Sequence, residues 1–477
     1  MSTKHVATLC RKLGFNKGAP RLWIEGIFPS RAGFKPGTRY SVSSPDGEKR
    51  VVLKIDDKGV RLVSSKTKAD RELPVIDLNS RELLERFDGM DMVRVVMREG
   101  EIHILASAVE IKKAERKKRL DESLAKGTIA VGAVSHGVGV IDHAMHTGLA
   151  REGIRSRLGW ICEIEDVYAE QAAYANEVWD DSTQALVMPL QTLAFADDYT
   201  LSQIPKTDMV IAGLPCTAAS LSGRAKKGLA MPEHDKVAGH LVAPFIALLA
   251  RINPAIVVLE NVPVYFNTAS ASILRTSLEE LGFVLHETVF DGQQYAIETR
   301  QRQVLVAITE GVDFDFESLV APPRAEQPLG TILEDVALDD PMWKEVPYLK
   351  AKQERDQAAG KGFKMQLVDV DTIHVGTQGR GYAKARSTEA RLVHPTDPEK
   401  SRLFTPLEHA RIKGIPEHLI KDVESNTRAH EMLGQSAVWG CFVHLGSHLG
   451  QALANYSQRP VLEPADAEAP LPLFNAA

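Results

Sequence analysis

Short apolar runs in the middle of the chain are each followed directly by glycine or polar residues. Four of them span residues 128–134, 158–162, 207–211 and 255–259. The last run, Ala-Ile-Val-Val-Leu, is continuous rather than alternating, as in a strand that is covered on both faces of a parallel sheet. Ligands bind beyond the carboxyl ends of parallel strands, so the residues that follow these runs are the candidate site residues. We therefore predict an α/β fold whose strand ends carry the chemistry.

The composition is that of a soluble globular protein. The 477 residues, 44% of them hydrophobic and 25% charged, are enough for about two to three domains. The N-terminus lacks an apolar signal core, and the longest apolar stretch, residues 241–259, is interrupted by polar residues and a proline, which predicts a cytoplasmic protein that does not enter a membrane. The cysteines form no CxxC pair and predict neither a metal site nor a disulfide framework: Cys10, Cys162, Cys216 and Cys441.

The first 126 residues differ in charge and pattern from the rest. They carry 27 Lys and Arg against 18 Asp and Glu, a net charge of +9, whereas the whole chain has −6 and the remainder therefore −15. Alternating segments predict a small, mostly β module with one hairpin between residues 50–55 and 59–63 and another between 93–96 and 101–105. A helix over 110–126 follows, rich in Lys and Arg. We expect it to contact a phosphate backbone, and a solvated linker helix is the alternative.

A cofactor cradle is predicted where the first apolar run ends. Residues 128–134 lead into Ser135-His-Gly137-Val-Gly139 and then into a helical pattern, and a Gly-x-Gly turn between strand and helix cradles nucleotide-type cofactors. The next strand ends at Glu163, and a carboxylate in that position suits the hydroxyls of a ribose. The sequence therefore predicts a Rossmann-like cofactor site.

A thiol, a carboxylate and two guanidinium groups are predicted at the neighbouring strand ends. Residues 207–211 are followed by Cys216, residues 255–259 by Glu260, and residues 304–308 are preceded by Arg300 and Arg302. A buried, inert cysteine is the alternative for Cys216 on its own. Together, these groups fit the transfer of a methyl group to a cytosine ring. A thiolate that adds to the ring activates the neighbouring carbon, and a carboxyl group and an arginine bind the polar edge of the base.

The order of five segments resembles the DNA cytosine-5-methyltransferase family. Residues 213–220, Gly-Leu-Pro-Cys-Thr-Ala-Ala-Ser, resemble its Gly-Phe-Pro-Cys-Gln-x-Phe-Ser motif, and residues 260–262 match Glu-Asn-Val. Residues 298–302, Glu-Thr-Arg-Gln-Arg, resemble Gln-x-Arg-x-Arg. Residues 403–416, Leu-Phe-Thr-Pro-Leu-Glu-His-Ala-Arg-Ile-Lys-Gly-Ile-Pro, resemble Leu-Thr-x-x-Glu-x-x-Arg-Leu-Gln-Gly-Phe-Pro. Residues 434–438, Gly-Gln-Ser-Ala-Val, resemble Gly-Asn-Ser-Val. The resemblance covers residues 128–310 and 400–457.

The resemblance implies a division of the chain and a role for each segment. After the N-terminal module (1–126) it implies a Rossmann-like S-adenosylmethionine-dependent methyltransferase domain (127–310) with an inserted target-recognition domain (311–399). The chain then returns to the catalytic domain (400–457) and ends in a tail (458–477). The catalytic residues would be Cys216, Glu260, Arg300 and Arg302. S-adenosylmethionine would be held by Ser135, Gly137, Gly139, Glu163, Pro215, Gln435 and Ser436. Duplex DNA, from which the target base is flipped out, would be contacted by Ser220, Arg224, Lys226, Lys227, Lys117 and Lys118.

Departures from the family pattern lie mostly on the cofactor side. Ser135 replaces an aromatic residue, Val140 the last glycine of the first motif, and Gln435 an asparagine, while Glu298 replaces the glutamine of the arginine motif. We expect a monomeric DNA cytosine-5-methyltransferase from a phage or a restriction-modification system. A catalytically silent DNA-binding protein on the same scaffold is the alternative, and methylation of RNA is a third hypothesis.

Overall fold

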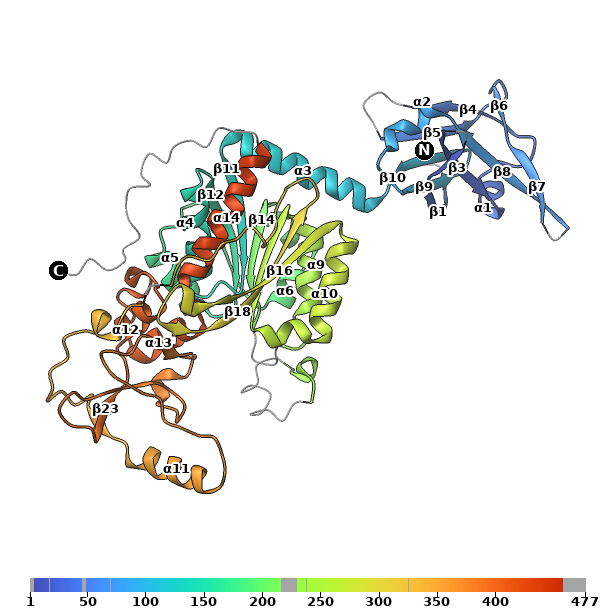
Figure 1. Cartoon of the computed structure of the whole chain (residues 1–477). Helices are drawn as coiled ribbons and strands as arrows, with labels where there is room; N and C mark the ends of the chain where they lie inside the picture. The colour runs from blue at the N-terminus through green and yellow to red at the C-terminus, as the bar shows by residue number, and fades with distance from the viewer. Residues whose placement is uncertain are drawn as a thin grey trace. The chain divides into compact units, whose positions relative to one another are not determined.

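The chain forms two compact units, Met1–Glu115 and Arg116–Ala477 (Figure 1). The structure is a computed structural model and describes residues 4–16, 18–44, 49–68, 70–215, 230–236, 238–324 and 326–457. Helix α3 (Ala108–Lys126) contains the boundary between the units. In the part of the chain that is described, no helix has both the length and the apolar character that crossing a membrane requires.

The N-terminal unit consists of two antiparallel sheets with short helices beside them. The six-stranded sheet has the order β1 (His5–Lys12), β9 (Met92–Arg98), β10 (Glu101–Ala106), β5 (Arg50–Ile55), β4 (Arg39–Ser43), β6 (Arg61–Leu62). The four-stranded sheet has the order β2 (Gly14–Asn16), β3 (Ala19–Glu25), β8 (Arg71–Asn79), β7 (Ser64–Lys68). The helices are α1 (Ile27–Arg31), α2 (Arg81–Leu84) and η1 (Glu85–Phe87).

The alternation of apolar residues sets which face of these strands is buried. Val51 and Leu53 of β5 and Ile102 and Ile104 of β10 are fully buried in the core of the unit. The predicted hairpin between β9 and β10 is confirmed. The predicted hairpin between residues 50–55 and 59–63 is wrong, because β5 and β6 each pair with β4 and not with one another. Alternation determines the buried face of a strand and leaves its partner open.

The C-terminal unit is built on a seven-stranded sheet. Its order is β13 (Gln184–Val187), β12 (Arg155–Glu163), β11 (Thr128–Val134), β14 (Met209–Gly213), β15 (Ile256–Asn261), β18 (Gln301–Thr309), β16 (Phe283–Asp291). The first five strands are parallel, and β18 runs antiparallel to both of its neighbours. The sequence order of the strands reverses at β11 and β14, which is where ligands bind in such sheets.

Helices cover both faces of this sheet (Figure 1). Alternate residues of β15 face two separate cores, Ile256 and Val258 on one side and Val257 and Leu259 on the other. The first core includes α4 (Val140–Arg151) and α14 (Trp439–Ser457), and the second α6 (Leu190–Ala194), α9 (Val242–Ile252) and α10 (Ala269–Glu280). Helix α9 starts at Val242, and in the turn before it the side chain and the carbonyl of Asp235 accept the backbone N–H groups of Ala238 and Gly239.

The segment between the arginine motif and the final motifs has little regular structure. It contains a four-stranded sheet, β19 (Lys344–Glu345), β23 (Lys400–Arg402), β22 (Arg391–Val393), β20 (Leu367–Val368), and the strand β21 (Val375–Gly376), which pairs with β17 (Glu298–Thr299) of the arginine motif. The other α-helices among the described residues of the unit are α5 (Asp166–Ala175), α7 (Asp198–Gln203), α11 (Pro347–Ala358), α12 (Pro406–Ile412) and α13 (Asn426–Gln435). Single 3-10 turns are η2 (Pro232–His234), η3 (Pro263–Asn267), η4 (Gly292–Gln294), η5 (Leu329–Ile332), η6 (Tyr382–Lys384) and η7 (Glu417–Ile420).

Candidate active site

The loop from β11 to α4 has the backbone conformation that the glycine pattern predicts. Ser135, Gly137 and Gly139 all have positive φ, at 55°, 59° and 75°. A Cβ on Gly139 would lie 2.5 Å from Nδ2 of Asn176, so only glycine fits there. Among the described residues, no atom lies within 4 Å of the place where a Cβ of Gly137 would be. The loop is therefore tightly packed at Gly139 and open at Gly137.

Glu163, at the end of β12, lies against this loop. Its Oε2 accepts the backbone N–H of Gly137 at 2.7 Å, and its Oε1 accepts those of Ile164 and Glu165. Glu163 is 7% exposed, and its Oε2, which accepts one hydrogen bond, can still accept another. Ile164 is 62% exposed and Val187, which pairs with Glu163 across the sheet, is 41% exposed. A carboxylate thus lies beside an exposed apolar surface at this strand end.

Strand β14, which lies beside β11 in the sheet, ends shortly before the predicted nucleophile Cys216 in the sequence. Asn261, at the end of β15, donates from Nδ2 to the carbonyl of Leu214 at 3.1 Å and accepts the N–H of Val262 at its Oδ1. Asn261 is 1% exposed, whereas Pro215 is exposed. The predicted site residues that follow Pro215 lie outside the described residues: Cys216, Ser220, Arg224, Lys226 and Lys227.

Glu260 and Arg302 are brought together at the same edge of the sheet. The two side chains form an ion pair, and each is 13% exposed. Glu260 pairs with Gly213 in the sheet, and its Oε2 lies 3.7 Å from the place where a Cβ of Gly213 would be. A carboxylate and a guanidinium that neutralise each other therefore stand beside the residue three positions before Cys216.

Arg300 points away from this pair and into the protein. It is 5% exposed and donates to the carbonyls of Gln378, at 3.3 Å, and Gly434, at 3.2 Å. The structure thus separates the two arginines that the motif places side by side. Arg302 lies at the sheet edge with Glu260, and Arg300 connects the arginine motif to the insert and to the final motif.

The two predicted cofactor residues of the final motif, Gln435 and Ser436, both donate hydrogen bonds within the C-terminal unit. Gln435 donates from Nε2 to the hydroxyl of Tyr168, on α5, at 3.0 Å. Ser436 donates from Oγ to the carbonyl of Met432 at 2.9 Å. Because α5 follows β12 and Glu163, the contact with Tyr168 ties Gln435 to the predicted cofactor side of the sheet.

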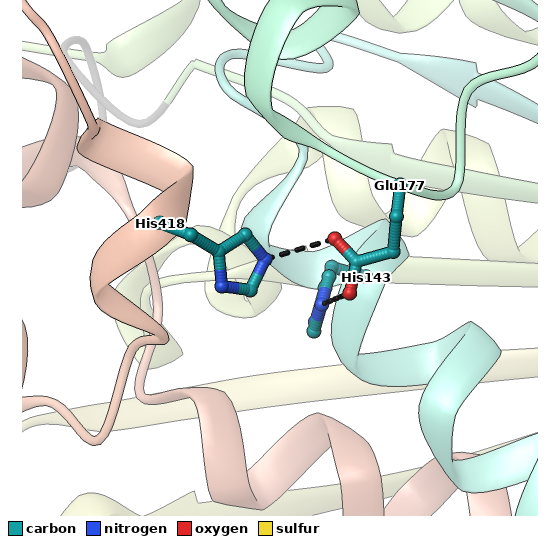
Figure 2. Close-up of side chains that lie close together, drawn as sticks. All are labelled: His143, Glu177 and His418. Carbon is teal, nitrogen blue, oxygen red and sulfur yellow. Dashed lines mark hydrogen bonds and ion pairs between the residues drawn. The ribbon is translucent and has the colours of Figure 1, made fainter.

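Three side chains form the group that most resembles a metal site among the described residues (Figure 2). Glu177 accepts from His143 Nε2 and from His418 Nε2, both at 2.8 Å. Trp439 donates its indole N–H to His143 Nδ1 at 2.9 Å. Since this ring nitrogen accepts, the proton of the neutral imidazole sits on Nε2, which then cannot bind a metal. Burial also lowers the pKa of His143, which favours the neutral ring. The group therefore forms hydrogen bonds that connect α4, the segment after α5, and η7.

The basic residues of α3 do not share one exposed face. Arg116 is fully buried and donates to the carbonyls of residues 281 and 282 and to a side-chain hydroxyl, while its guanidinium stacks on Phe283. Lys117 contacts the hydroxyl of Tyr456. The side chain of Lys118 is 79% exposed. Of the two predicted DNA contacts on this helix, Lys118 points into solvent and Lys117 is engaged within the protein.

A comparison with protein families shows to which family the chain belongs. The pattern of the family described as C-5 cytosine-specific DNA methylase matches residues 169–451, more than half of the chain. The chain belongs to this family. The predicted family, the predicted fold class and the prediction of a DNA cytosine-5 methyltransferase are therefore confirmed. The match leaves residues 1–168 outside, and with them the whole N-terminal unit and the loop after β11.

Similar proteins named as type II methyltransferases are known from several bacteria. The type II methyltransferase M1.ScrFI of Lactococcus lactis subsp. cremoris is 28% identical over 247 residues, which cover 49% of this chain and 59% of the relative. The type II methyltransferase M.NlaX of Neisseria lactamica is 27% identical over 310 residues, or 62% of this chain and 90% of the relative. This chain thus matches somewhat more than half of the first relative and most of the second.

Two solved structures show the same fold. The Dnmt2 methyltransferase of S. pombe superposes with a TM-score of 0.52 at 18% identity, over 69% of this chain and 98% of that one. The Entamoeba histolytica methyltransferase EhMeth superposes with a TM-score of 0.53 at 14% identity, over 69% and 98%. These similarities confirm the methyltransferase fold.

Two residues of this cytosine-5 methyltransferase are missing from the sequence-based prediction of the site. Asn261 lies inside the Glu-Asn-Val motif, and its place directly after Glu260 is the signal that could have found it. Lys413 occupies the glutamine position of the Arg-Leu-Gln-Gly-Phe-Pro pattern and is fully buried against Glu298. Glu298 and Lys413 each replace a glutamine of the family pattern, and each replacement is visible in the sequence. Their contact is not, because it joins positions 115 residues apart.

Proposed function

We propose that the chain methylates carbon 5 of a cytosine in duplex DNA through a covalent bond between Cys216 and carbon 6 of the ring. The observation that carries the proposal is the Glu260–Arg302 ion pair beside Gly213, three positions before Cys216. A carboxylate and a guanidinium match the polar edge of cytosine, and the adjoining strand leads to a thiol. S-adenosylmethionine supplies the methyl group that carbon 5 accepts.

Each protein group then has a defined task. The Cys216 thiolate adds to carbon 6, and the electron pair displaced from the C5–C6 bond makes carbon 5 nucleophilic. The Glu260 carboxyl group accepts a hydrogen bond from the exocyclic amine and shares a proton with the ring nitrogen, and Arg302 donates to the ring carbonyl. After methylation, carbon 5 loses its proton and the C6–S bond breaks, which restores the ring and the thiolate. In the absence of a base, Glu260 and Arg302 satisfy each other.

The loop at β11 fits S-adenosylmethionine. The space at Gly137 is open, the neighbouring α4 begins at Gly139, and a helix N-terminus favours a carboxylate such as that of the methionyl part. The remaining acceptor capacity of Glu163 suits ribose hydroxyls, and the exposed Ile164 offers an apolar surface for the adenine ring. Ser135, Pro215, Gln435 and Ser436 remain the other proposed cofactor residues.

Duplex DNA is the proposed partner of the basic residues. Ser220, Arg224, Lys226 and Lys227 follow Cys216 in the sequence, and Lys118 is exposed on α3. The positive charge of residues 1–126 would add contacts to phosphates that do not depend on the base sequence. The relatives are named as type II methyltransferases, and we propose that this chain is likewise the modification enzyme of a restriction-modification system.

The test is nucleoside mass spectrometry of DNA from a methylation-free host that expresses the protein. We expect 5-methylcytosine with the wild type and none with Cys216→Ala. Cys10→Ala is the matched control, because Cys10 is the exposed thiol among the described cysteines and lies in the other unit. Unmodified DNA with soluble wild type would contradict the activity and support the silent DNA-binding alternative. Modification by Cys216→Ala would contradict the covalent mechanism.

A further inference from the structure

A buried ion pair lies behind the arginine motif. Lys413 Nζ is 2.9 Å from Glu298 Oε2, and both side chains are 0% exposed. Lys413 also donates to the carbonyl of Ser436 at 3.2 Å, and Glu298 Oε1 accepts the N–H of Gln378 at 2.7 Å. The pair thus joins three segments, namely the strand of the arginine motif, the insert through Gln378, and the final motif through Ser436.

Arg300 makes a second connection between the same segments. It donates to the carbonyls of Gln378 and Gly434 and lies 3.9 Å from Glu298 Oε1. Glu298 therefore has two cationic side chains within reach, and its short contact is with Lys413. A Cβ on Gly434 would lie 2.3 Å from the backbone of Gly379, so the insert and the final motif are in direct contact here.

Both members of the pair depart from the family pattern. Glu298 occupies the first position of Gln-x-Arg-x-Arg, and Lys413 occupies the glutamine of Arg-Leu-Gln-Gly-Phe-Pro. Lys413 alone would be buried without a counter-charge, which is strongly unfavourable, and Glu298 alone would be left with Arg300 at 3.9 Å, whereas Glu298 and Lys413 together compensate. The two departures are therefore one coupled change.

We propose that Glu298 and Lys413 are a pair of positioning residues that fixes the recognition insert against the strand carrying Arg302. Lys413 engages Glu298, so that Arg300 keeps donating to the carbonyls of Gln378 and Gly434. Without Lys413, the Glu298 carboxylate draws Arg300 away from these carbonyls, and the insert loses its anchor. Arg300 directly precedes β18, and Arg302 is the second residue of that strand, so the shift reaches the group that faces the base. The inference rests on the proposed function and adds how target base and insert are aligned.

The charges around Lys413 allow a pH test of the pair. The charged or titratable groups that face it are Glu298, Arg300 and Arg302 from the strand side and His409 from its own helix. Burial and the positive charge of Arg300 lower the pKa of Lys413 to about 7, against the opposite effect of Glu298. Removing Glu298 would lower this pKa further, and the resulting neutral amine can hydrogen-bond a glutamine amide.

The experiment is a double-mutant cycle in the full-length protein with Glu298→Gln, Lys413→Gln and the double variant, which restores both glutamines of the family pattern. We measure kcat and the KM for duplex DNA, together with thermal unfolding. Each single variant should lose roughly tenfold to a hundredfold in kcat/KM, and the double variant should recover to within about threefold of wild type. The matched control uses the same substitutions in the exposed pair Lys54 and Glu101 of the N-terminal unit, whose effects should be small and additive.

The pH profile provides a readout that a merely structural pair would not change. Glu298→Gln should regain activity as pH rises through the lowered pKa of Lys413, which lies below 7, because the amine is neutral above it; the loss in this variant is therefore measured below that pH, and Lys413→Gln should not regain activity. The wild-type profile should contain a limb near neutral pH that is missing from the double variant. The comparison between the wild type and the double variant does not need the single variants. It can therefore be made even when a single variant does not fold.

Additive losses in the cycle would overturn the proposal. So would single variants with lowered thermal stability but wild-type kcat, KM and pH profile. A wild-type protein without turnover would contradict the proposed function instead. In that case the cycle is read from the affinity for duplex DNA, where coupling between Glu298 and Lys413 supports the pairing and additivity overturns it.

Discussion

At the scale of single residues, Asn261 has the most direct influence on the proposed nucleophile. Its side-chain amide is buried and holds the carbonyl of Leu214, two residues before Cys216. In Asn261→Asp, a carboxylate would face this carbonyl without a proton to donate, and the backbone would move away. We expect kcat to fall by about 10- to 100-fold with a KM for DNA close to wild type, since displacement of a reacting group by about 1 Å costs that much.

Steady-state kinetics with a thermal-unfolding control would check this prediction for Asn261. A variant that keeps wild-type kcat would show that the contact with Leu214 does not position the thiol. A variant that is unfolded would be replaced by Asn261→Ser, which keeps a small donor.

Gly137 and Gly139 allow the cofactor site to be separated from the structure of the loop. Both have positive φ, so alanine costs about 1 kcal/mol or more at either position. Only at Gly139 does a Cβ also overlap Asn176. Gly139→Ala should therefore lower the unfolding temperature clearly more than Gly137→Ala. If S-adenosylmethionine occupies the open space at Gly137, then Gly137→Ala should weaken cofactor binding in calorimetry despite its milder effect on stability. Unchanged binding in Gly137→Ala would place the cofactor elsewhere.

At the scale of elements, α3 combines an anchor with an exposed basic surface. Arg116 satisfies two carbonyls and a hydroxyl and stacks on Phe283 in the buried interior. Arg116→Met keeps the apolar stem but leaves these acceptors without the donor, so we expect a loss of about 3 kcal/mol in the free energy of unfolding. Lys118→Ala, the exposed counterpart, should leave stability unchanged and reduce the salt dependence of DNA binding. Urea titrations and binding at several salt concentrations would measure both, and equal effects of the two variants on stability would contradict the assignment.

Five of the seven strands in the large sheet, β11, β12, β14, β15 and β18, are predictable from the sequence because each contains an apolar run with a candidate chemical group near one end; β13 and β16 lack this signal and are not predicted. Val257 and Val258 belong to two different cores, which explains why that run does not alternate. In the N-terminal unit, the runs at residues 50–55 and 59–63 are strands as predicted, but their predicted pairing is wrong. Their common partner β4 is a matter of tertiary arrangement, and local alternation carries no information about it.

The burial and the partners of the charged side chains are harder to predict than the positions of the helices and strands. Arg116 and Lys118 look alike in the sequence, and only the carbonyls of residues 281 and 282, far along the chain, decide that Arg116 is buried. Glu298 is visible in the sequence as a departure from the motif, but its partner Lys413 is 115 residues away. Cys216 and the basic residues that follow it, Arg224, Lys226 and Lys227, lie outside the described residues, so their roles remain predictions from the sequence.

At the scale of the whole molecule, buried histidines make stability depend on pH. Burial lowers the pKa of His146 and of His430 to about 4. Their unfolded forms take up protons near pH 6.5, so the unfolded state binds more protons between about 4 and 6.5, and stability falls as pH decreases through this window. Each histidine contributes roughly 3 kcal/mol at most to this loss. Unfolding at pH 7 and pH 4.5 should show a smaller difference for His146→Asn than for wild type, while the exposed His5→Asn serves as control. An unchanged difference would contradict the assignment to His146.

The division into two units predicts how far the N-terminal unit can be removed. Leu120 and Leu124, in the second half of α3, belong to the core of the C-terminal unit, and Arg116 is anchored there as well. A protein lacking residues 1–107 keeps these interactions, whereas one lacking residues 1–126 does not. We therefore expect methyl transfer with near wild-type kcat from the shorter deletion and a poorly folded protein from the longer one.

Residues 1–107 contain 20 Lys and Arg and 14 Asp and Glu, a net charge of +6. If this charge meets DNA, the shorter deletion should weaken binding and flatten its dependence on salt, by a slope of about 0.9 for each phosphate that is no longer neutralised. Lys118 stays in the deleted protein, so Lys118→Ala should flatten the slope further by an independent amount. A deletion that leaves the slope unchanged would separate the N-terminal unit from DNA binding. Its basic surface would then face a different partner, while the catalytic unit alone accounted for the affinity.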